Sequence, residues 1–195
     1  RVALDKKGLK YTRMEGEAKF YGPAIDIKVK DAIGRGWQGP TIQVDFNLPE
    51  RFDVDYVGPD GLHHRVVMVH RTVLGAMERF VGCLIEHYAG DFPLWFAPIQ
   101  MRILTITDAH IDYAKKLQAQ LLARSFRVEC DTRNAKISYK IREGTLEKIP
   151  YLLVVGDKEM EGSAVAVRSR KKGNEGMMLI DDFIKNAESE VREKR

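Results

Sequence analysis

The stretch VMVHRTVLGAMERF, residues 67–80, decides how the first half of this chain folds, because an apolar strand in it turns directly into an amphipathic helix. In a strand, successive side chains point to opposite faces, so Val67 and Val69 share one face. His70 then lies on the other face, at the end of the strand. A histidine at such a junction predicts a ligand site, although a single histidine is more often a satisfied structural residue.

The helix that follows has an apolar stripe and an arginine outside it. Its apolar residues recur at spacings of three and four: Leu74, Met77, Val81, Leu84 and Tyr88. Gly90 stands where such a helix is expected to stop. Because Arg79 falls off the stripe, we expect its side chain to reach back towards the sheet that contains His70.

The length and composition are those of a soluble protein with one large domain or two smaller ones. The chain has 195 residues, 44% of them hydrophobic, and a formal net charge of +4. No apolar run approaches the roughly 18 residues that span a bilayer, and the first residues lack the layout of a signal peptide. A cytoplasmic protein is therefore expected. Cys83 and Cys130 belong to no CxxC pair, and both are expected to be buried thiols.

Two halves with different patterns are separated by GDFPLWFAPIQ, residues 90–100, where prolines interrupt regular structure and aromatic residues must pack. Before it, residues 25–29 and 41–46 alternate as strands of an antiparallel sheet do. After it, the pattern predicts strands at 103–106, 126–130, 150–155 and 165–169, helices at 108–124 and 137–148, and a last helix opening at Asp181 or Asp182. This alternation makes the second half α/β.

The strand GPTIQVDF, residues 39–46, has one apolar and one polar face. The apolar face, which is expected to be core, carries Ile42, Val44 and Phe46, and the polar face carries Thr41, Gln43 and Asp45. A hydroxyl and an amide two residues apart on a rigid strand suit the recognition of a small polar molecule. The alternative is a solvated face of the kind that antiparallel sheets commonly show.

Most of the clustered basic residues lie in the second half, in RNAKISYKIR, residues 133–142, and in RKK, residues 170–172. Such clustering makes nucleic acid a candidate partner, whereas the commoner fate of a basic run is to solvate a surface. Five of these residues are expected to attract phosphates without sequence preference: Lys136, Lys140, Arg170, Lys171 and Lys172.

Several uncommon strings follow one another along the chain: FYGPAIDI, GRGWQGPTIQVDFNLPERF, VMVHRTVLGAMERF, GDFPLWFAPIQ and DTRNAKISYKIREGTLEKIPYLLVVGDKE. In this order they closely resemble the C-terminal part of the threonyl-tRNA synthetase family, over nearly the whole chain. The resemblance implies the C-terminal portion of an α+β, antiparallel-sheet class II catalytic core, followed by an α/β anticodon-binding domain with a mixed sheet. The implied boundaries are 1–92 for the core portion with motif 3, 93–100 for a linker and 101–195 for the anticodon-binding domain.

By this resemblance, His70 matches a histidine that helps to bind a zinc ion, which contacts the amino group and hydroxyl of threonine. A neutral imidazole suits Zn²⁺, and a site that binds a hydroxyl rejects valine more strongly than a hydrophobic pocket can. Thr41 and Gln43 match residues that line the threonine and adenylate pocket, and Gln38 matches one near the ATP ribose. Arg79 matches the motif 3 arginine that binds ATP phosphate and offsets charge as the adenylate forms. The implied cofactors are ATP, Mg²⁺ and Zn²⁺.

Two positions depart from the pattern of the family. Ala24 stands where many relatives carry a lysine close to the substrates, and Ala76 stands where many carry serine. The resemblance also places two further zinc ligands and the adenine-binding motif 2 before the first residue of this chain. His63 and His64, in an expected turn, are poor replacements, because spare surface histidines seldom assemble a closed metal site. The chain by itself is therefore expected to be inactive as an enzyme.

In the second half, the resemblance matches four residues to positions that contact the anticodon: Asn134, Arg142, Glu159 and Arg168. Proteins read the splayed bases of such a loop through hydrogen bonds to base edges and through stacking. A glutamate can accept from the Watson–Crick edge of guanine, and arginines can bind bases or phosphates. For each arginine taken alone, a surface salt bridge is the simpler interpretation.

The implied function is ATP-dependent activation of threonine and its transfer to tRNA(Thr), by a full-length parent that is expected to be a homodimer with no membrane partner. A second hypothesis is a noncatalytic tRNA-binding fragment, or a paralogue that has lost adenylation. A related class II synthetase for another amino acid is disfavoured by His70 and the TIQ strand. An assay of ATP–pyrophosphate exchange separates the first two hypotheses.

Overall fold

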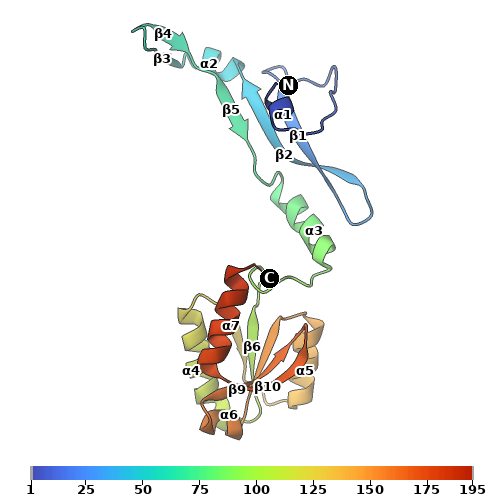
Figure 1. Ribbon diagram of the computed structural model, residues 1–195, viewed down its shortest axis with the longest axis vertical. Helices are drawn as coiled ribbons and strands as arrows, with labels where there is room; N and C mark the ends of the chain where they lie inside the picture. Colours follow the sequence, from blue (N-terminus) through green and yellow to red (C-terminus); the bar gives the residue numbers. More distant parts are fainter. Residues whose placement is uncertain (1, 195) are drawn as a thin grey trace. The chain divides into compact units, whose positions relative to one another are not determined.

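The computed structural model describes residues 2–194, and the chain divides into two compact units, residues 1–87 and 88–195 (Figure 1). None of the helices in the described range is both long enough and apolar enough to cross a membrane.

The first unit is built on an antiparallel sheet of three strands in the order β1-β2-β5. These strands are β1 (Ala24–Lys30), β2 (Gly36–Asp45) and β5 (Met68–Arg71). A small hairpin pairs β3 (Asp55–Val57) with β4 (His63–Arg65). The helices are α1 (Val2–Lys6), α2 (Asn47–Arg51) and α3 (Met77–Tyr88), of which α3 ends at the first residue of the second unit.

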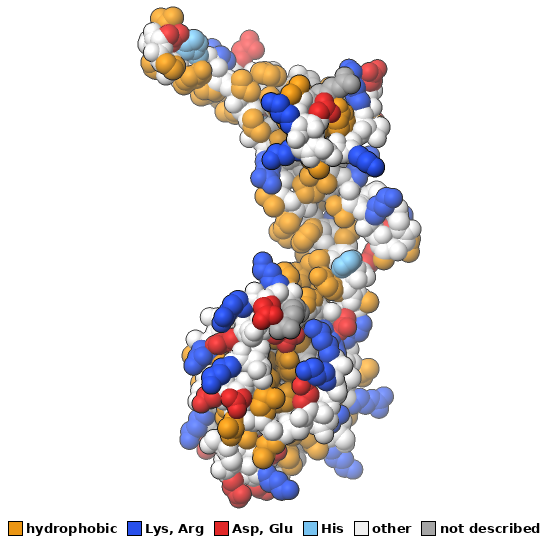
Figure 2. All heavy atoms as spheres, in the orientation of Figure 1, with side chains coloured by type: hydrophobic (Ala, Val, Ile, Leu, Met, Phe, Trp, Pro, Cys, Tyr) orange, Lys and Arg blue, Asp and Glu red, His pale blue; other side chains and the backbone are white. Residues whose placement is uncertain are grey.

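The apolar face of β2 is not a core within the described part of the first unit, which corrects the sequence prediction. Ile42 and Val44 are only half-buried, and Phe46 is 53% exposed. The most buried side chain of the strand is instead Asp45, on the polar face. The apolar face of a sheet is normally covered by a second layer of structure. Figure 2 shows instead that hydrophobic side chains lie at the surface of this unit.

The second unit contains a mixed sheet of five strands in the order β10-β9-β8-β6-β7. Its strands are β6 (Met101–Thr105), β7 (Val128–Asp131), β8 (Tyr151–Val155), β9 (Ala164–Ser169) and β10 (Gly173–Leu179). β6 runs parallel to β7 and β8, whereas β9 runs antiparallel to β8 and β10. The helices are η1 (Asp108–His110), α4 (Ile111–Ala123), α5 (Ile137–Leu146), α6 (Asp157–Glu161) and α7 (Ile180–Arg192). The predicted fold class, an antiparallel sheet followed by an α/β unit with a mixed sheet, is confirmed.

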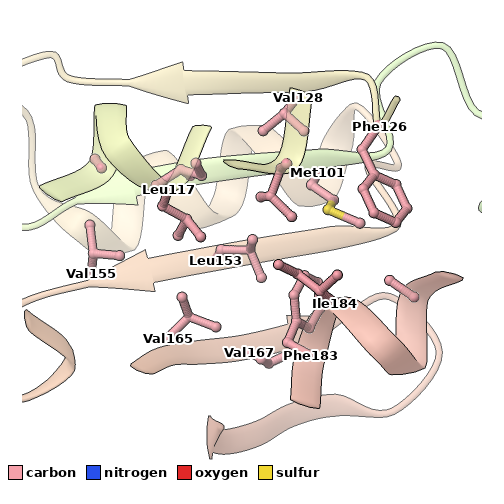
Figure 3. Packing of buried hydrophobic residues seen from close by; sticks show 14 of the residues in the cluster. Met101, Leu117, Phe126, Val128, Leu153, Val155, Val165, Val167, Phe183 and Ile184 are labelled. Atoms are coloured by element: carbon pink, nitrogen blue, oxygen red, sulfur yellow. The ribbon is translucent and has the colours of Figure 1, made fainter. Parts of the chain in front are cut away.

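The main core of the second unit lies between the sheet and the helices α4 and α7 (Figure 3). Leu117 of α4 and Phe183 of α7 are at most 2% exposed and belong to one cluster with Leu153 and Val167 of the sheet. A smaller cluster around Leu152 lies on the other face, with apolar residues of α5. The sheet is therefore covered on both faces, by α4 and α7 on one side and by α5 on the other (Figure 1). Burial of each such large apolar side chain stabilises the unit by about 2 kcal/mol.

Some element boundaries differ from the sequence prediction. The helix expected from Asp108 begins as the short helix η1. Its N-cap is Thr107 and not Asp108, and the Thr107 backbone N–H donates to His110 Nδ1 at 3.2 Å. The strand β10 and helix α6 were not predicted, because GNEGMML and DKEME show no sustained apolar period. The predicted helices from 137 and at the C-terminus are present, and the latter begins at Ile180.

Two predictions about single residues are also wrong. His63 and His64 lie in strand β4, not in a turn. Cys83 and Cys130 are both half-buried free thiols, not fully buried ones. For Cys130, burial raises the pKa of the thiol, with a further contribution from the neighbouring carboxylate.

Within the second unit, Arg170 fixes the segment that follows α3, which corrects the prediction that this residue is a free surface cation. The Arg170 side chain is 16% exposed and forms an ion pair with Asp91. Its guanidinium also donates to the carbonyl oxygens of Lys148, at 2.6 Å, and Phe92, at 2.7 Å. The ring of Phe92 in turn packs edge-on to Phe96, with centroids 5.4 Å apart.

Lys140 is likewise not a surface cation, since it is only 1% exposed. Its ammonium donates to the carbonyl oxygens of Thr105, at 2.9 Å, and Asp131, at 3.1 Å. The same nitrogen lies 3.9 Å from the Asp131 carboxylate. Lys140 thus ties α5 to the ends of β6 and β7, because buried charges persist only where such partners surround them.

We expect Lys140→Met to destabilise the second unit by about 2–4 kcal/mol, because it removes a charged donor from the buried carbonyl oxygens of Thr105 and Asp131. Lys136→Met, at an exposed position one turn earlier, is the matched control and should change stability by less than about 0.5 kcal/mol. Urea unfolding followed by far-UV circular dichroism measures both. Equal stability of the two variants would contradict the structural role of Lys140.

Candidate functional site

One face of the β1-β2-β5 sheet gathers the polar residues that the sequence singled out in the first unit. Gln43 pairs with His70 of β5 and with Ala24 of β1, so these three residues share a face. Thr41 lies two residues before Gln43 and therefore on the same face. The Tyr21 hydroxyl donates to Gln43 Oε1 at 3.0 Å and adds an aromatic ring to this group.

The imidazole of His70 is fixed by a buried carboxylate. His70 Nε2 donates to Asp45 Oδ2 at 3.0 Å, and the side chains are 45% and 5% exposed respectively. Asp45 Oδ1 also accepts the backbone N–H groups of Leu48, at 3.0 Å, and Asn47, at 2.8 Å. The Leu48 N–H bond, opposed by burial and assisted by His70, keeps the pKa of Asp45 below its ordinary value.

This arrangement fits a histidine that is one ligand of a metal ion. A ligating histidine commonly donates its second ring N–H to a carboxylate, which fixes the ring, and Asp45 occupies that position for His70. Residues 2–194 contain no group of three or more His, Cys, Asp or Glu side chains placed to hold a metal. His70 therefore has the carboxylate partner that a ligating histidine commonly has, and among the described residues His63 and His64 belong to no such ligand group.

A bulge in the pairing of β2 brings Gln38 to the same side as Thr41, although the spacing of three would place them on opposite faces of a regular strand. Asp26 of β1 pairs with Thr41, whereas Lys28 pairs with Gln38, so the register shifts between them. As a result, Gln38 Nε2 donates to Asp26 Oδ1 at 3.1 Å. Gly39 within the bulge has no room for a side chain, because a Cβ there would lie 2.8 Å from a methyl group of Val29.

Arg79 of α3 reaches this bulge, as its place off the apolar stripe predicts. Its guanidinium donates to the carbonyl oxygen of Gln38 at 2.8 Å and lies 5.5 Å from the centre of the Trp37 ring. The loop before α3 packs directly on the bulge through Gly75, which has a φ of +75°. A Cβ added at this position would lie only 2.8 Å from the Gly39 carbonyl oxygen. Glycine at position 75 thus permits the approach that puts Arg79 beside β2, whereas the lack of a side chain at Gly39 accommodates the neighbouring strand β1.

Asp31 and Trp37 form a second layer under Arg79 that the sequence analysis missed. The Asp31 carboxylate is 1% exposed and accepts the Trp37 Nε1–H at 3.0 Å and the Arg35 Nε–H at 2.6 Å. It also accepts the backbone N–H groups of Ile33, at 3.1 Å, and Arg35, at 2.8 Å. The signal was present, since an aspartate ahead of a glycine turn and a tryptophan that needs an acceptor predict such a pairing.

In the second unit, Arg168 lies on the sheet face that α5 covers. It pairs with Leu152 of β8, which belongs to the cluster beneath α5, and with Asn174 of β10 on its other side. Arg142 is an exposed residue of α5, and Asn134 is exposed just before that helix. These three predicted RNA contacts therefore come from neighbouring elements of one unit, β9, α5 and the segment before α5.

Glu159 has a structural contact of its own. Its Oε2 accepts the N–H of Gly156 at 3.0 Å, an interaction that closes the start of α6. The carbonyl oxygen of Glu159 accepts the hydroxyl of Tyr113 at 3.1 Å. The carboxylate is thus held in place on the end of β8, and it is half-buried.

A charged network close to α5 was also missed. The Arg102 guanidinium donates to both carboxylate oxygens of Glu147, at 2.8 and 2.6 Å, and to Glu129 at 2.7 Å. Arg133 bridges Asp131 and Glu143. These residues line a hollow of about 380 Å³. The pKa of Arg133 is raised, mainly by its hydrogen bond to Asp131 and to a smaller extent by its hydrogen bond to Glu143.

In comparisons with known proteins, two parts of the chain match two different protein families. Residues 3–88 match the family described as tRNA synthetase class II core domain (G, H, P, S and T), and residues 98–190 match the anticodon binding domain family. The chain belongs to the class II aminoacyl-tRNA synthetases. Within that class, it is similar along its whole length to the C-terminal part of threonyl-tRNA synthetases.

Two curated relatives and one solved structure show the extent of this similarity. A threonine–tRNA ligase of Clostridium botulinum (strain Loch Maree / Type A3) is 55% identical over 194 residues, which are 100% of this chain and 31% of the relative. The ligase of Clostridium acetobutylicum is 53% identical over 98% of this chain and 30% of its own length. A crystal structure of the RNA binding domain of threonyl-tRNA synthetase from Cryptosporidium parvum Iowa II has a TM-score of 0.87 and 37% identity, covering 96% of this chain and 48% of that one. This chain thus spans about a third of the length of the curated relatives.

The pKa of Asp31 gives a testable property of the second layer. Burial alone would raise it from the ordinary value of 3.8, but hydrogen bonds from Trp37 and Arg35 outweigh burial and lower it to about 2. A lowered pKa means that the bond to Trp37 is fully present above about pH 4 and is lost only as the pH falls through about 2.

We therefore expect the indole N–H resonance of Trp37 to stay constant on acidification until the pH approaches 2, while the unit remains folded. NMR titration measures this, with the resonance assigned by its loss in Trp37→Phe and with Trp95, the other tryptophan, as internal control. A midpoint near 4 would show that the carboxylate is not held in this way.

Proposed function

We propose that this chain is the C-terminal part of a threonine–tRNA ligase, a protein that activates threonine with ATP and transfers it to tRNA(Thr). In this proposal residues 1–92 are the end of the catalytic core, residues 93–100 are a linker and residues 101–195 read the anticodon. The ligase as a whole is a cytoplasmic homodimer. The similarity of the chain to threonine–tRNA ligases along its entire length supports the proposal, and the parts beyond this third of the protein supply the remaining machinery.

The observation that carries the proposal is the convergence of Gln38, Gln43, His70 and Arg79 on one strand and its immediate neighbours. Gln43 and His70 are direct cross-strand partners, and Arg79 donates to the backbone of Gln38. Side chains held on paired strands keep their positions within narrow limits, as a site that must distinguish small amino acids requires.

Activation of threonine joins its carboxylate to the α-phosphate of ATP, and pyrophosphate leaves. Arg79 suits the nucleotide side of this step, because its guanidinium stays charged and can offset negative charge as it develops on the phosphate. Gln38, beside it, suits the ribose, and its amide is already oriented by Asp26. Mg²⁺ bound with ATP would neutralise further phosphate charge.

Threonine itself would lie over Thr41, Gln43 and His70. The Thr41 hydroxyl is buried without a hydrogen-bond partner among the described residues, which indicates a place for a further polar group. His70, fixed by Asp45, would be one ligand of Zn²⁺, and the bound ion would supply a Lewis acid that recognises the amino group and hydroxyl of threonine. The chain contributes a pre-oriented imidazole to that site.

In the second unit, Asn134, Arg142, Glu159 and Arg168 would contact the anticodon. Exposed Arg142 and half-buried Arg168 provide cations, while the carboxylate of Glu159 is fixed at the start of α6. A fixed acceptor and planar guanidinium groups suit base edges and phosphates of a single-stranded loop. Lys136, Lys171 and Lys172, all exposed, would add attraction that weakens with salt.

A noncatalytic tRNA-binding protein is the second candidate, and Ala24 is the observation that favours it. Ala24 faces Gln43 on the polar side of the sheet, so the lysine that many relatives carry there would point into the same site. Its absence removes one positive charge from the substrate side. Measurement of adenylation decides between the two candidates.

We expect the full-length ligase that carries this chain to exchange pyrophosphate with ATP in the presence of threonine. Arg79→Ala should lower the exchange about 10²- to 10³-fold, because it removes a donor to the developing charge. Arg71→Ala is the matched control, since Arg71 pairs with Ile42 on the opposite face of the sheet, and it should change exchange by less than about twofold. Absence of exchange in the unaltered protein would favour the noncatalytic candidate.

We expect Arg168→Ala to weaken binding of the chain to the anticodon stem-loop of tRNA(Thr) about tenfold at moderate salt, as loss of one base contact does. Arg124→Ala is the control, because Arg124 ends α4 on the other face of the sheet and pairs with Glu188. Fluorescence anisotropy with a labelled stem-loop measures both. Equal affinities for the two variants would contradict an RNA surface beside α5.

A further inference from the structure

The carboxylate beneath Arg79 is more buried than its surroundings. Among residues 2–87, only Asp31, Asp45, Pro49 and Gly58 are buried, and Asp31 has the least exposed carboxylate, at 1%. A carboxylate that accepts four hydrogen bonds, two from backbone and two from side chains, is fully satisfied in that position. The turn between β1 and β2 is therefore organised around this one group.

The same carboxylate fixes the plane of an aromatic ring. A tryptophan indole can rotate about its side-chain bonds, and the bond from Trp37 Nε1 to Asp31 Oδ2 removes that freedom. Two guanidinium groups lie near the fixed ring, those of Arg35 at 5.6 Å and Arg79 at 5.5 Å from its centre. A guanidinium over an indole face is held by the charge distribution of the ring.

Arg79 is thus held at two points by neighbouring residues of β2, through the Gln38 carbonyl oxygen and the Trp37 ring. The carbonyl contact fixes one nitrogen, and the ring contact fixes the orientation of the guanidinium plane. Removing the support of Trp37 would leave Arg79 with a single hydrogen bond and free rotation about it.

We propose that Asp31 is a positioning residue for nucleotide binding, which acts by orienting Trp37 so that the indole holds the Arg79 guanidinium in place. This inference rests on the proposed role of Arg79 in binding ATP. Neither Asp31 nor Trp37 needs to touch the nucleotide, and their effect reaches the substrate only through Arg79.

Asp31→Asn in the full-length ligase tests the inference. The variant replaces one carboxylate oxygen by an NH₂ group, which cannot accept the hydrogen bonds from Trp37 and Arg35. We expect the KM for ATP in pyrophosphate exchange to rise about tenfold, with the KM for threonine unchanged. Trp37→Phe, which keeps a ring but loses the Nε1–H, should raise the KM for ATP about threefold. Asp60→Asn is the control, since Asp60 also organises a turn, through Leu62 and His64, but in the β3–β4 hairpin.

Addition of Asp31→Asn to Arg79→Ala should change exchange no further, because a residue that acts through another loses its effect when that other is absent. If the losses of exchange caused by Asp31→Asn and Arg79→Ala multiply in the double variant, the inference is overturned. It is also overturned if Arg79→Ala is impaired but Asp31→Asn has the same KM for ATP as the control Asp60→Asn. If Arg79→Ala itself retains full exchange, the proposed role of Arg79 fails, and the inference with it. Circular dichroism checks folding, and Trp37→Phe carries the test if Asp31→Asn unfolds.

Discussion

The position of β2 between β1 and β5 is the constraint on which the rest of the first unit depends. Each cross-strand pair fixes which side chains share a face, and a slip by one residue would turn Gln43 away from His70. The one irregularity, at Gly39 and the following proline, is what places Gln38 on the side of Thr41. The loop before α3 fits that bulge closely, so the position of Arg79 is a consequence of the strand register and not of α3 alone.

The two units reach order by different means. The second unit has a hydrophobic cluster between its sheet and the helices α4 and α7, and a smaller one beneath α5. The described part of the first unit has no buried hydrophobic cluster, and its most enclosed side chains are carboxylates that accept backbone N–H groups. Hydrogen bonds of this kind set local geometry well but contribute about 1 kcal/mol each to stability. The first unit is therefore organised around polar residues, whereas the second is organised around its core.

The sequence allowed prediction of features that depend on periodicity. The polar face with Gln43 and His70, the helix that carries Arg79 and the α/β alternation of the second unit all follow from apolar spacing, whereas its mixed sheet was implied by the family resemblance. Contacts between residues distant in sequence were less accessible. Lys140 was expected at the surface because a lysine in a basic run usually lies there, and only the fold shows that the ends of β6 and β7 surround it. Asp31 was missed for a different reason: its partner Trp37 is only six residues away, across a turn, and the turn signal was present but not used.

The choice of arginine over lysine explains several of these contacts together. A guanidinium is planar, so Arg79 can donate to a carbonyl oxygen and lie over an indole ring at the same time. Arg102 uses the same shape to bind both oxygens of Glu147 while it contacts Glu129, and Arg170 donates to three carbonyl oxygens beside its ion pair. An ammonium group has no plane to orient. Apart from buried Lys140, the fixed positive charges described above are therefore arginines, and most of the lysines that remain exposed are available for attraction without direction.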